Sequence, residues 1–144
     1  LASRKGAIAV EAQPLPTPWP DPARCVILPL PVDQGDWRLR HKTSDRGFYD
    51  DARAVAQDHG ADEALFIRDD GLLTEGSVSN IFVERDGVLL TPPAALGLLP
   101  GIYRQSLIES GRAREAELSV ADLENGFFIG NALRMLCPAV LKPA

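Results

Sequence analysis

Two Asp-Gly pairs, each set between short apolar runs, constrain the fold of this chain more than any other sequence feature. They lie in Asp69–Gly71 and Arg85–Gly87. Asp-Gly suits the tight turns whose backbone matches the twist of two antiparallel strands, so the sequence predicts two successive β-hairpins. The apolar runs are Ala64–Ile67 with Leu72–Leu73, and Asn80–Val83 with Val88–Leu90.

The sequence also predicts two helices, one from the spacing of apolar residues and one from the residues at its ends. Apolar residues recur at helical intervals in Phe48–His59, and Gly60 follows as a C-terminal stop. A second helix is expected to run through about Ser110, with Pro100 near its first turn and Gly111 after its end. Both helices are expected to interrupt pairs of strands.

Further strands are expected near both ends of the chain. Ala7–Ala12 and Cys25–Val32 have β-like composition and are bridged by the proline-rich connector Pro14–Pro22. Phe127–Gly130 and Met135–Leu141 complete the set. Because helices interrupt the strands at no regular βαβ period, the sequence favours an α+β domain over a doubly wound sheet.

The composition favours a soluble globular chain and argues against nucleic acid or a membrane as its partner. The 144 residues have room for one domain, with 45% hydrophobic and 24% charged residues. A net charge of −5 does not favour nucleic acid or an anionic membrane surface, and no apolar run approaches the ~18 residues of a membrane span. Cys25 and Cys137 are too few and too far apart for a metal cluster or a disulfide framework. We therefore expect a cytoplasmic protein with no metal site.

Three polar segments and one lysine could carry chemistry, although each alone has an ordinary structural explanation. Thr74–Asn80 is rich in small residues and includes Glu75. Pro100–Arg104 opens a helix whose unpaired N–H groups would suit a phosphate, and Gly130–Leu133 follows an apolar strand. Lys42 lies in a polar segment, whereas the other two lysines lie near the termini.

Taken in order, these segments resemble the class IV pyridoxal-phosphate enzymes, which include branched-chain and D-amino-acid aminotransferases and 4-amino-4-deoxychorismate lyases. The resemblance runs from about His41 to Val140. It implies pyridoxal 5'-phosphate as cofactor and an α+β fold in which a mixed sheet forms a pseudo-barrel with flanking helices. The matching motifs are His41–Thr43, His59–Ala64, Leu73–Phe82, Thr91–Pro92, Leu99–Arg104, and Gly130–Leu133 with Pro138.

The resemblance implies a role for five residues. Lys42 matches the catalytic Schiff-base lysine, and a primary amine suits both that bond and proton transfer. Glu75 matches the catalytic carboxylate that faces the pyridine nitrogen. Ile102 and Tyr103 match the backbone donors that hold the cofactor phosphate, and Asn131 falls where family members place a group near that phosphate.

Two short differences favour the lyase over an aminotransferase. Aminotransferases of this class tend to carry a tyrosine five residues past the lysine, where this chain has Gly47, and Lys42–Arg46 is closer to the lyase pattern. Asn131–Leu133 is also similar to the lyases. The resemblance then implies that Lys42 removes the proton on the amine-bearing ring carbon of aminodeoxychorismate, and that pyruvate leaves to give 4-aminobenzoate. The alternative is an aminotransferase acting on branched-chain or D-amino acids.

The resemblance further implies that residues 1–144 form the larger, cofactor-binding C-terminal domain, without the smaller N-terminal domain that supplies a phosphate-binding arginine. It implies a small-molecule substrate, a homodimer, and an enzyme fused to, or working with, aminodeoxychorismate synthase. Two other interpretations remain open. One is a cofactor-free binding domain, against which the retained Lys42 and Glu75 argue, and the other is a structural or interaction domain.

Overall fold

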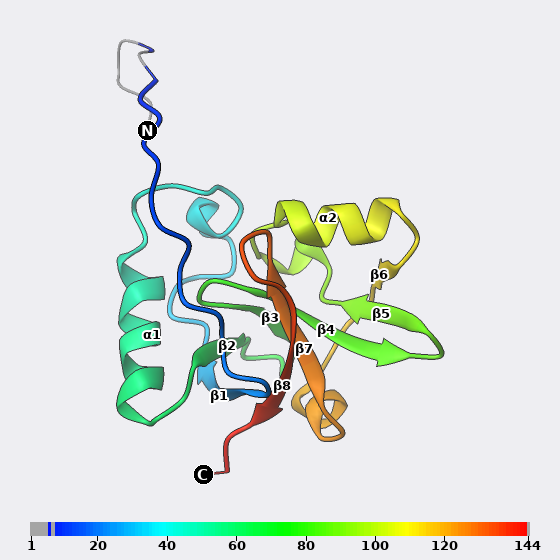
Figure 1. Ribbon diagram of the computed structural model, residues 1–144. Helices are drawn as coiled ribbons and strands as arrows, with labels where there is room; N and C mark the ends of the chain where they lie inside the picture. The colour runs from blue at the N-terminus through cyan, green and yellow to red at the C-terminus, as the bar shows by residue number, and fades with distance from the viewer. Residues whose placement is uncertain (1–5, 7, 144) are drawn as a thin grey trace.

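The computed structural model describes residues 6 and 8–143, and within these residues eight strands form one mixed sheet (Figure 1). The strand order is β3-β2-β1-β8-β7-β4-β5-β6. Strand β1 pairs in parallel with β2 and β8, and β5 pairs in parallel with β6, while the other pairings are antiparallel. The strands are β1 Ala23–Pro29, β2 Glu63–Ile67, β3 Leu73–Gly76, β4 Asn80–Arg85, β5 Val88–Thr91, β6 Ala113–Glu115, β7 Phe127–Asn131 and β8 Met135–Leu141.

Both hairpins form at the predicted Asp-Gly pairs. Strands β2 and β3 flank the first turn, and β4 and β5 flank the second. The glycines supply the left-handed backbone that these turns need, with φ of +84° at Gly71 and +77° at Gly87. The predicted strand pair β7–β8 is present as well.

Both predicted helices are confirmed. Helix α1 spans Gly47–Asp58, and α2 spans Ile102–Glu109. After α1 the chain reverses at Gly60, where φ is +67° and the backbone N–H donates to the Gln57 carbonyl at 2.8 Å. Three short 3-10 helices, Trp37–Leu39, Ala94–Leu96 and Val120–Leu123, join the larger elements among the described residues.

The predicted strand over Ala7–Ala12 is wrong for the residues that the structure describes. Residue 7 lies outside them, and residues 9–12 belong to no strand and run exposed along the molecule, with only an isolated bridge at Ile8 (Figure 1). Strand β1 also ends at Pro29 rather than Val32: the Leu30 N–H still donates to the Ile67 carbonyl at 2.8 Å, but Pro31 lacks the N–H for further pairing. The three-residue β6 had no distinguishing sequence pattern.

A very short connection forces the sheet to curl. Strands β3 and β4 occupy the first and sixth positions in the sheet, which would be about 24 Å apart if it were flat. Only residues 77–79 join them, and four Cα steps span at most about 14 Å. The sheet therefore curves until β3 and β4 approach, where the Gly76 N–H donates to the Ser79 carbonyl at 2.7 Å. This curvature is the expected pseudo-barrel.

The alternation of side chains along the strands divides the core between two faces. Ala64 and Phe66 of β2 pack beneath α1, and Phe82 of β4 packs beneath Leu107 of α2. Both helices therefore cover the same face (Figure 1). The opposite face buries Leu65, Leu73, Ile81, Val83, Leu90, Phe127 and Ile129 against Leu118 and Leu123. No helix among the described residues is long and apolar enough to cross a membrane.

Replacing Phe66 by alanine is expected to lower the free energy of unfolding by about 3–5 kcal/mol, because it empties a fully buried site beneath α1. Urea denaturation would measure the loss. The matched control is Val55→Ala on the outer side of α1, where the side chain is 41% exposed and the cost should be below about 1 kcal/mol. Equal losses in the two variants would contradict this packing.

Candidate functional site

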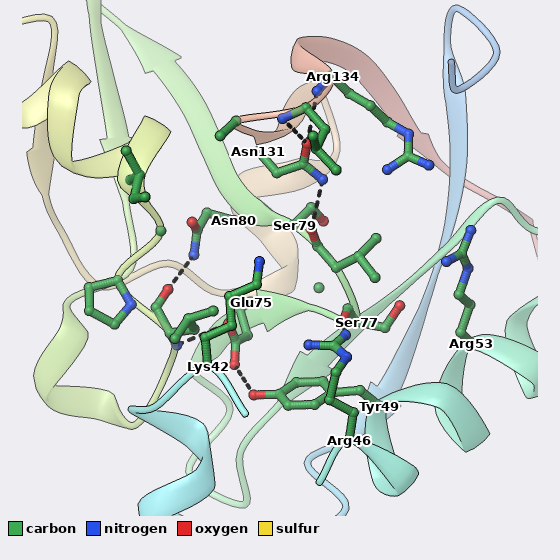
Figure 2. Close-up of a pocket in the computed structure, with 18 of the residues that line it drawn as sticks. Lys42, Arg46, Tyr49, Arg53, Glu75, Ser77, Ser79, Asn80, Asn131 and Arg134 are labelled. Carbon is green, nitrogen blue, oxygen red and sulfur yellow. Dashed lines mark hydrogen bonds between the residues drawn. The ribbon is translucent and has the colours of Figure 1, made fainter. Parts of the chain in front are cut away.

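A cavity of about 540 Å³ lies between α1, the start of α2 and the β7–β8 turn (Figure 2). Its walls come from five separate parts of the chain: Pro16, and residues within 42–53, 75–80, 99–102 and 131–134. These parts meet because the curled sheet places the β3–β4 loop beside the ends of the other elements. Four of the five sequence-predicted residues, Lys42, Glu75, Ile102 and Asn131, line this one cavity.

Lys42 enters the cavity from the irregular segment before α1. It is exposed, and its ammonium group makes no hydrogen bond or ion pair with any other residue between 8 and 143. In Figure 2 its side chain extends toward the centre of the cavity. A primary amine held at a cavity wall without a partner is free to react with a ligand.

Glu75 is the buried carboxylate of the cavity. It lies in β3 and is 3% exposed. One oxygen accepts a hydrogen bond of 2.6 Å from the Tyr49 hydroxyl, and the other accepts one of 3.0 Å from the Leu99 backbone N–H. Burial raises the pKa of Glu75 to about 8, although the bonds from Tyr49 and Leu99 and the nearby Arg46 oppose that rise. Glu75 is thus held in place and poised to change its protonation state near neutral pH.

A second buried carboxylate, Glu63 of β2, fixes the loop that follows Glu75. Its side chain is fully buried and accepts hydrogen bonds from the Ser77 hydroxyl at 2.5 Å, the Ser79 hydroxyl at 2.9 Å and the Val78 backbone N–H at 3.3 Å. Burial raises the pKa of Glu63. A β-carbon at Gly76 would collide with the Ser79 hydroxyl, so the loop needs glycine there. This support of the loop was not anticipated from the sequence.

Asn80 joins the β3–β4 loop to the segment that precedes α2. Its side-chain amide donates to the Leu99 carbonyl at 3.0 Å, and a β-carbon at Gly101 would lie 2.5 Å from its oxygen. Leu99 therefore contacts both Glu75 and Asn80, and the start of α2 is fixed relative to the buried carboxylate. The motifs around residues 75–80 and 99–104 are coupled parts of one site.

The start of α2 and the β7–β8 turn face the same cavity. The backbone N–H groups of Ile102 and Tyr103 lie in the first turn of α2, where an α-helix offers them no internal acceptor. The side chain of Ile102 is 82% exposed at the cavity, whereas that of Tyr103 packs away from it in the cluster beneath α2. Any contact of Tyr103 with a ligand would have to come from its backbone.

Asn131 is already engaged in structural hydrogen bonds. Its amide donates to the Val78 carbonyl at 2.9 Å, and its oxygen accepts from the backbone N–H groups of Leu133 at 3.0 Å and Arg134 at 2.9 Å. The side chain thus ties the β7–β8 turn to the β3–β4 loop. Its predicted place near a phosphate, like the other predicted roles, stays a prediction.

Four further cavity residues have no role predicted from the sequence. Tyr49 and Arg53 line the cavity from α1, Arg46 lines it from the position just before that helix, and Arg134 lines it from the β7–β8 turn. Arg46 donates to the Ser77 carbonyl at 3.0 Å and stacks on Tyr49. The intervals 46, 49 and 53 place three residues on one helix face, a spacing that could have identified them. Nothing in the sequence placed Arg134 beside them.

The arrangement can hold an anionic, carbonyl-bearing ligand and transfer protons. It combines a free amine, a buried carboxylate, arginines and unpaired helix N–H groups. No group of three or more His, Cys, Asp or Glu side chains suited to a metal ion occurs in the part of the chain that the structure describes.

Comparison with known proteins identifies one family. The profile of amino-transferase class IV matches residues 2–141. A protein of Schizosaccharomyces pombe named "Putative aminodeoxychorismate lyase" is 29% identical over 147 residues, which cover 96% of this chain and 64% of that protein. The chain therefore spans less than two thirds of the length of this relative.

Solved structures agree with the family. A "Putative amino-acid aminotransferase" from Mesorhizobium loti has a TM-score of 0.87 and 38% identity, covering 98% of this chain and 70% of that one. A "hypothetical aminotransferase from Mycobacterium tuberculosis" in its PLP-bound form has a TM-score of 0.76 and 27% identity, covering 85% and 48%. The α+β fold expected from the sequence is confirmed.

Replacing Glu75 by glutamine is expected to change how stability depends on pH in the cofactor-free protein. Folding raises the pKa of this carboxyl from about 4.5 to about 8, so the folded state holds a proton that the unfolded state has released. The carboxyl therefore makes the wild-type protein progressively less stable as pH rises between these values, by up to about 1.4 kcal/mol per pH unit. Urea denaturation at pH 5–8 should show the glutamine variant gaining relative stability as pH rises.

The matched control for this prediction is Glu84→Gln, at an exposed carboxylate with no side-chain hydrogen bond to the described residues. The difference between this control and wild type should stay constant with pH. A pH-independent difference for Glu75→Gln as well would contradict a raised pKa at Glu75.

Proposed function

Because this chain belongs to the amino-transferase class IV family of pyridoxal-phosphate-dependent enzymes, we propose that it supplies the catalytic residues of a 4-amino-4-deoxychorismate lyase. The observation that carries the proposal is the joint placement of Lys42 and Glu75 on one cavity, the first as a free amine and the second as a buried, hydrogen-bonded carboxylate. The reaction would convert aminodeoxychorismate to 4-aminobenzoate and pyruvate.

The donor set of the cavity fits pyridoxal phosphate. Lys42 would attach the cofactor, and Glu75 would face its ring nitrogen from a position fixed by Tyr49 and Leu99. The unpaired backbone N–H groups at Ile102 and Tyr103 suit a phosphate at the positive end of a helix. When bound, this cofactor supplies an electron-accepting ring for bonds broken at an amine-bearing carbon.

The residues of the chain then have separate tasks in the reaction. Lys42 would remove the proton from the amine-bearing ring carbon of the substrate, and the departing enol would take up a proton to become pyruvate. Glu75, as the buried carboxylate, would hold a proton between its oxygen and the ring nitrogen. The surrounding apolar and backbone groups around Leu99 and Pro100 would limit access of water to that end of the cavity.

Two features support the lyase over an aminotransferase. Gly47 stands where aminotransferases of this class tend to carry a tyrosine, and no heavy atom of the rest of the chain lies within 4 Å of the place its β-carbon would occupy. Tyr49, two residues further along the chain, does carry a phenol, but its hydroxyl donates a hydrogen bond to Glu75. The lyase-named relative from Schizosaccharomyces pombe also aligns with 96% of the chain.

An aminotransferase is the second candidate. The solved structure from Mesorhizobium loti, named as an aminotransferase, is 38% identical over nearly the whole chain. An aminotransferase needs the same lysine and the same carboxylate, because it also breaks a C–H bond beside an amine. Lys42 and Glu75 therefore do not distinguish a lyase from an aminotransferase. If the protein is an aminotransferase, we propose branched-chain or D-amino acids as its substrates.

The whole protein's organisation is also a proposal. We propose that residues 1–144 act as the larger domain of the family, that a smaller domain adds a phosphate-binding arginine, and that the protein is a cytoplasmic homodimer. A link to aminodeoxychorismate synthase, by fusion or by association, follows only from the proposed reaction. The shorter span of the chain relative to its lyase-named relative supports the two-domain proposal.

Lys42 is expected to carry the cofactor covalently. Borohydride reduction of the cofactor-loaded full-length protein, followed by peptide mass spectrometry, should place the pyridoxyl group on Lys42, and Lys42→Arg should abolish both the label and the activity. The matched control is Lys142→Arg, because Lys142 donates to the His59 carbonyl outside the cavity. A label on Lys5 or Lys142 in the wild-type protein would refute the assignment.

The lyase is expected to form 4-aminobenzoate and pyruvate from aminodeoxychorismate without any keto acid, because the reaction needs no second amino-group acceptor. Chromatography of the products would follow both compounds in equal amounts over many turnovers. An aminotransferase would give rapid exchange between amino and keto acids and no 4-aminobenzoate. That result would favour the second candidate.

A further inference from the structure

Positive charge is concentrated at the cavity of a chain that is negatively charged overall. The chain carries a net charge of −5, yet the charged residues that line the cavity are one lysine, three arginines and one glutamate. Figure 2 shows Arg46, Arg53 and Arg134 along one side, apart from Asn80 and the segment before α2 on the other. This distribution suits a ligand with more than one negative charge.

Arg134 is oriented before any ligand binds. Its backbone N–H is held by Asn131, its guanidinium Nε donates to the Thr17 carbonyl at 3.2 Å, and its guanidinium carbon lies 4.7 Å from the centre of the Trp19 ring. Stacking on an aromatic ring and a backbone contact fix the plane of the guanidinium while leaving its other N–H groups for a ligand. The side chain is half-buried and has no carboxylate partner within residues 8–143.

Arg53 presents a second cation to the same side of the cavity. It is half-buried on α1, and its guanidinium makes no hydrogen bond or ion pair with the described residues. Burial and the charge of Arg53 both lower the pKa of Arg134, while the buried Glu63 opposes this effect. Two neighbouring cations without a carboxylate between them repel each other, and a bound anion would offset this repulsion.

Most other arginines among the described residues either have a carboxylate partner or are exposed. Arg24, Arg38, Arg68, Arg85 and Arg104 each have a carboxylate partner. Arg112 and Arg114 have none within the described part of the chain, but they are exposed, where water screens their charge. Arg46 is also half-buried without an ion pair, but it donates to the Ser77 carbonyl and its charge acts on Glu75. Arg53 and Arg134 differ because they are half-buried, have no carboxylate partner among the described residues and lie near each other at the cavity.

We propose that Arg53 and Arg134 together bind a carboxylate of the substrate that lies away from the reacting amine, and that they select substrates carrying such a group. The proposal rests on the proposed function, since that function places the amine-bearing carbon at Lys42. Figure 2 separates Lys42 from both arginines across the cavity, so the carboxylate they hold is remote from that carbon. Guanidinium groups bind carboxylates with charge-assisted hydrogen bonds.

The test uses isophthalate, an aromatic dianion with no amine that cannot react, and isophthalamide, its uncharged analogue. Calorimetric titration into the pyridoxal-phosphate-loaded full-length protein should show binding of isophthalate and at least about tenfold weaker binding of isophthalamide. Arg53→Gln and Arg134→Gln should each weaken isophthalate binding by about tenfold or more. The matched control is Arg114→Gln, at an exposed residue of strand β6 outside the cavity, which should leave the affinity unchanged.

Two further measurements separate a binding role from a structural one. Arg134→Lys keeps the charge and should retain more affinity than Arg134→Gln, whereas a purely structural stacking role on Trp19 would make the two variants alike. In the Gln variants the KM for aminodeoxychorismate should rise about tenfold while kcat changes less than about threefold. Arg53→Gln tests the proposal without disturbing the packing of Trp19, because the Trp19 ring stacks with Arg134 and not with Arg53.

Three results would overturn the proposal. They are the absence of isophthalate binding to the wild-type protein, unchanged isophthalate affinity in both Gln variants, and a matching loss of affinity for pyridoxal phosphate, which would assign the pair to the cofactor phosphate. Failure of the lyase reaction gives a different outcome. If no 4-aminobenzoate forms but isophthalate binding still depends on both arginines, the carboxylate pair stands and the proposed reaction is wrong.

Discussion

The hydrogen bonds of the buried Glu63 carboxylate with the β3–β4 loop are the interaction on which the rest of the site depends. The loop has only three residues, and it must join two strands that are far apart in the order of the sheet. Glu63 satisfies the hydroxyl groups of Ser77 and Ser79 and two backbone N–H groups at this closure. Without this acceptor the two hydroxyl groups and the Val78 N–H would lose their partner, at a cost of about 1–3 kcal/mol for each buried group, whereas the Ser77 N–H would keep its bond to the Ala64 carbonyl.

This closure also determines where charge lies in the cavity. It brings Glu75 at the end of β3 within reach of Tyr49 from α1 and Leu99 from the segment before α2, so three distant parts of the chain fix one carboxylate. The same loop receives Arg46 through the Ser77 carbonyl and Asn131 through the Val78 carbonyl. The arginine-lined wall of the cavity and its buried carboxylate, Glu75, therefore both depend on the curl of the sheet.

Local patterns predicted most of the elements, because hairpins and helices depend on neighbouring residues. The two Asp-Gly turns and the stop at Gly60 formed as expected, since glycine is favoured where φ is positive. Residues 8–12 have strand-like composition, but only Ile8 forms an isolated bridge and residues 9–12 join no strand, because strand formation depends on neighbouring strands as well as on composition. Strand β6 was not predicted because its three residues have no strand-like pattern, and they form a strand only through pairing with β5.

The sequence by itself determined the family motifs, the two hairpins, both helices and the presence of Lys42 and Glu75 in polar segments, because these features lie within short stretches of chain. Only the tertiary structure decided that Glu75 bonds to Tyr49 and Leu99, that Asn131 is occupied in tying two turns together, and that Arg134 lies beside Arg53. Those contacts join residues tens of positions apart. Their positions depend on how far the sheet curls, which is a property of the assembled strands and of no single segment.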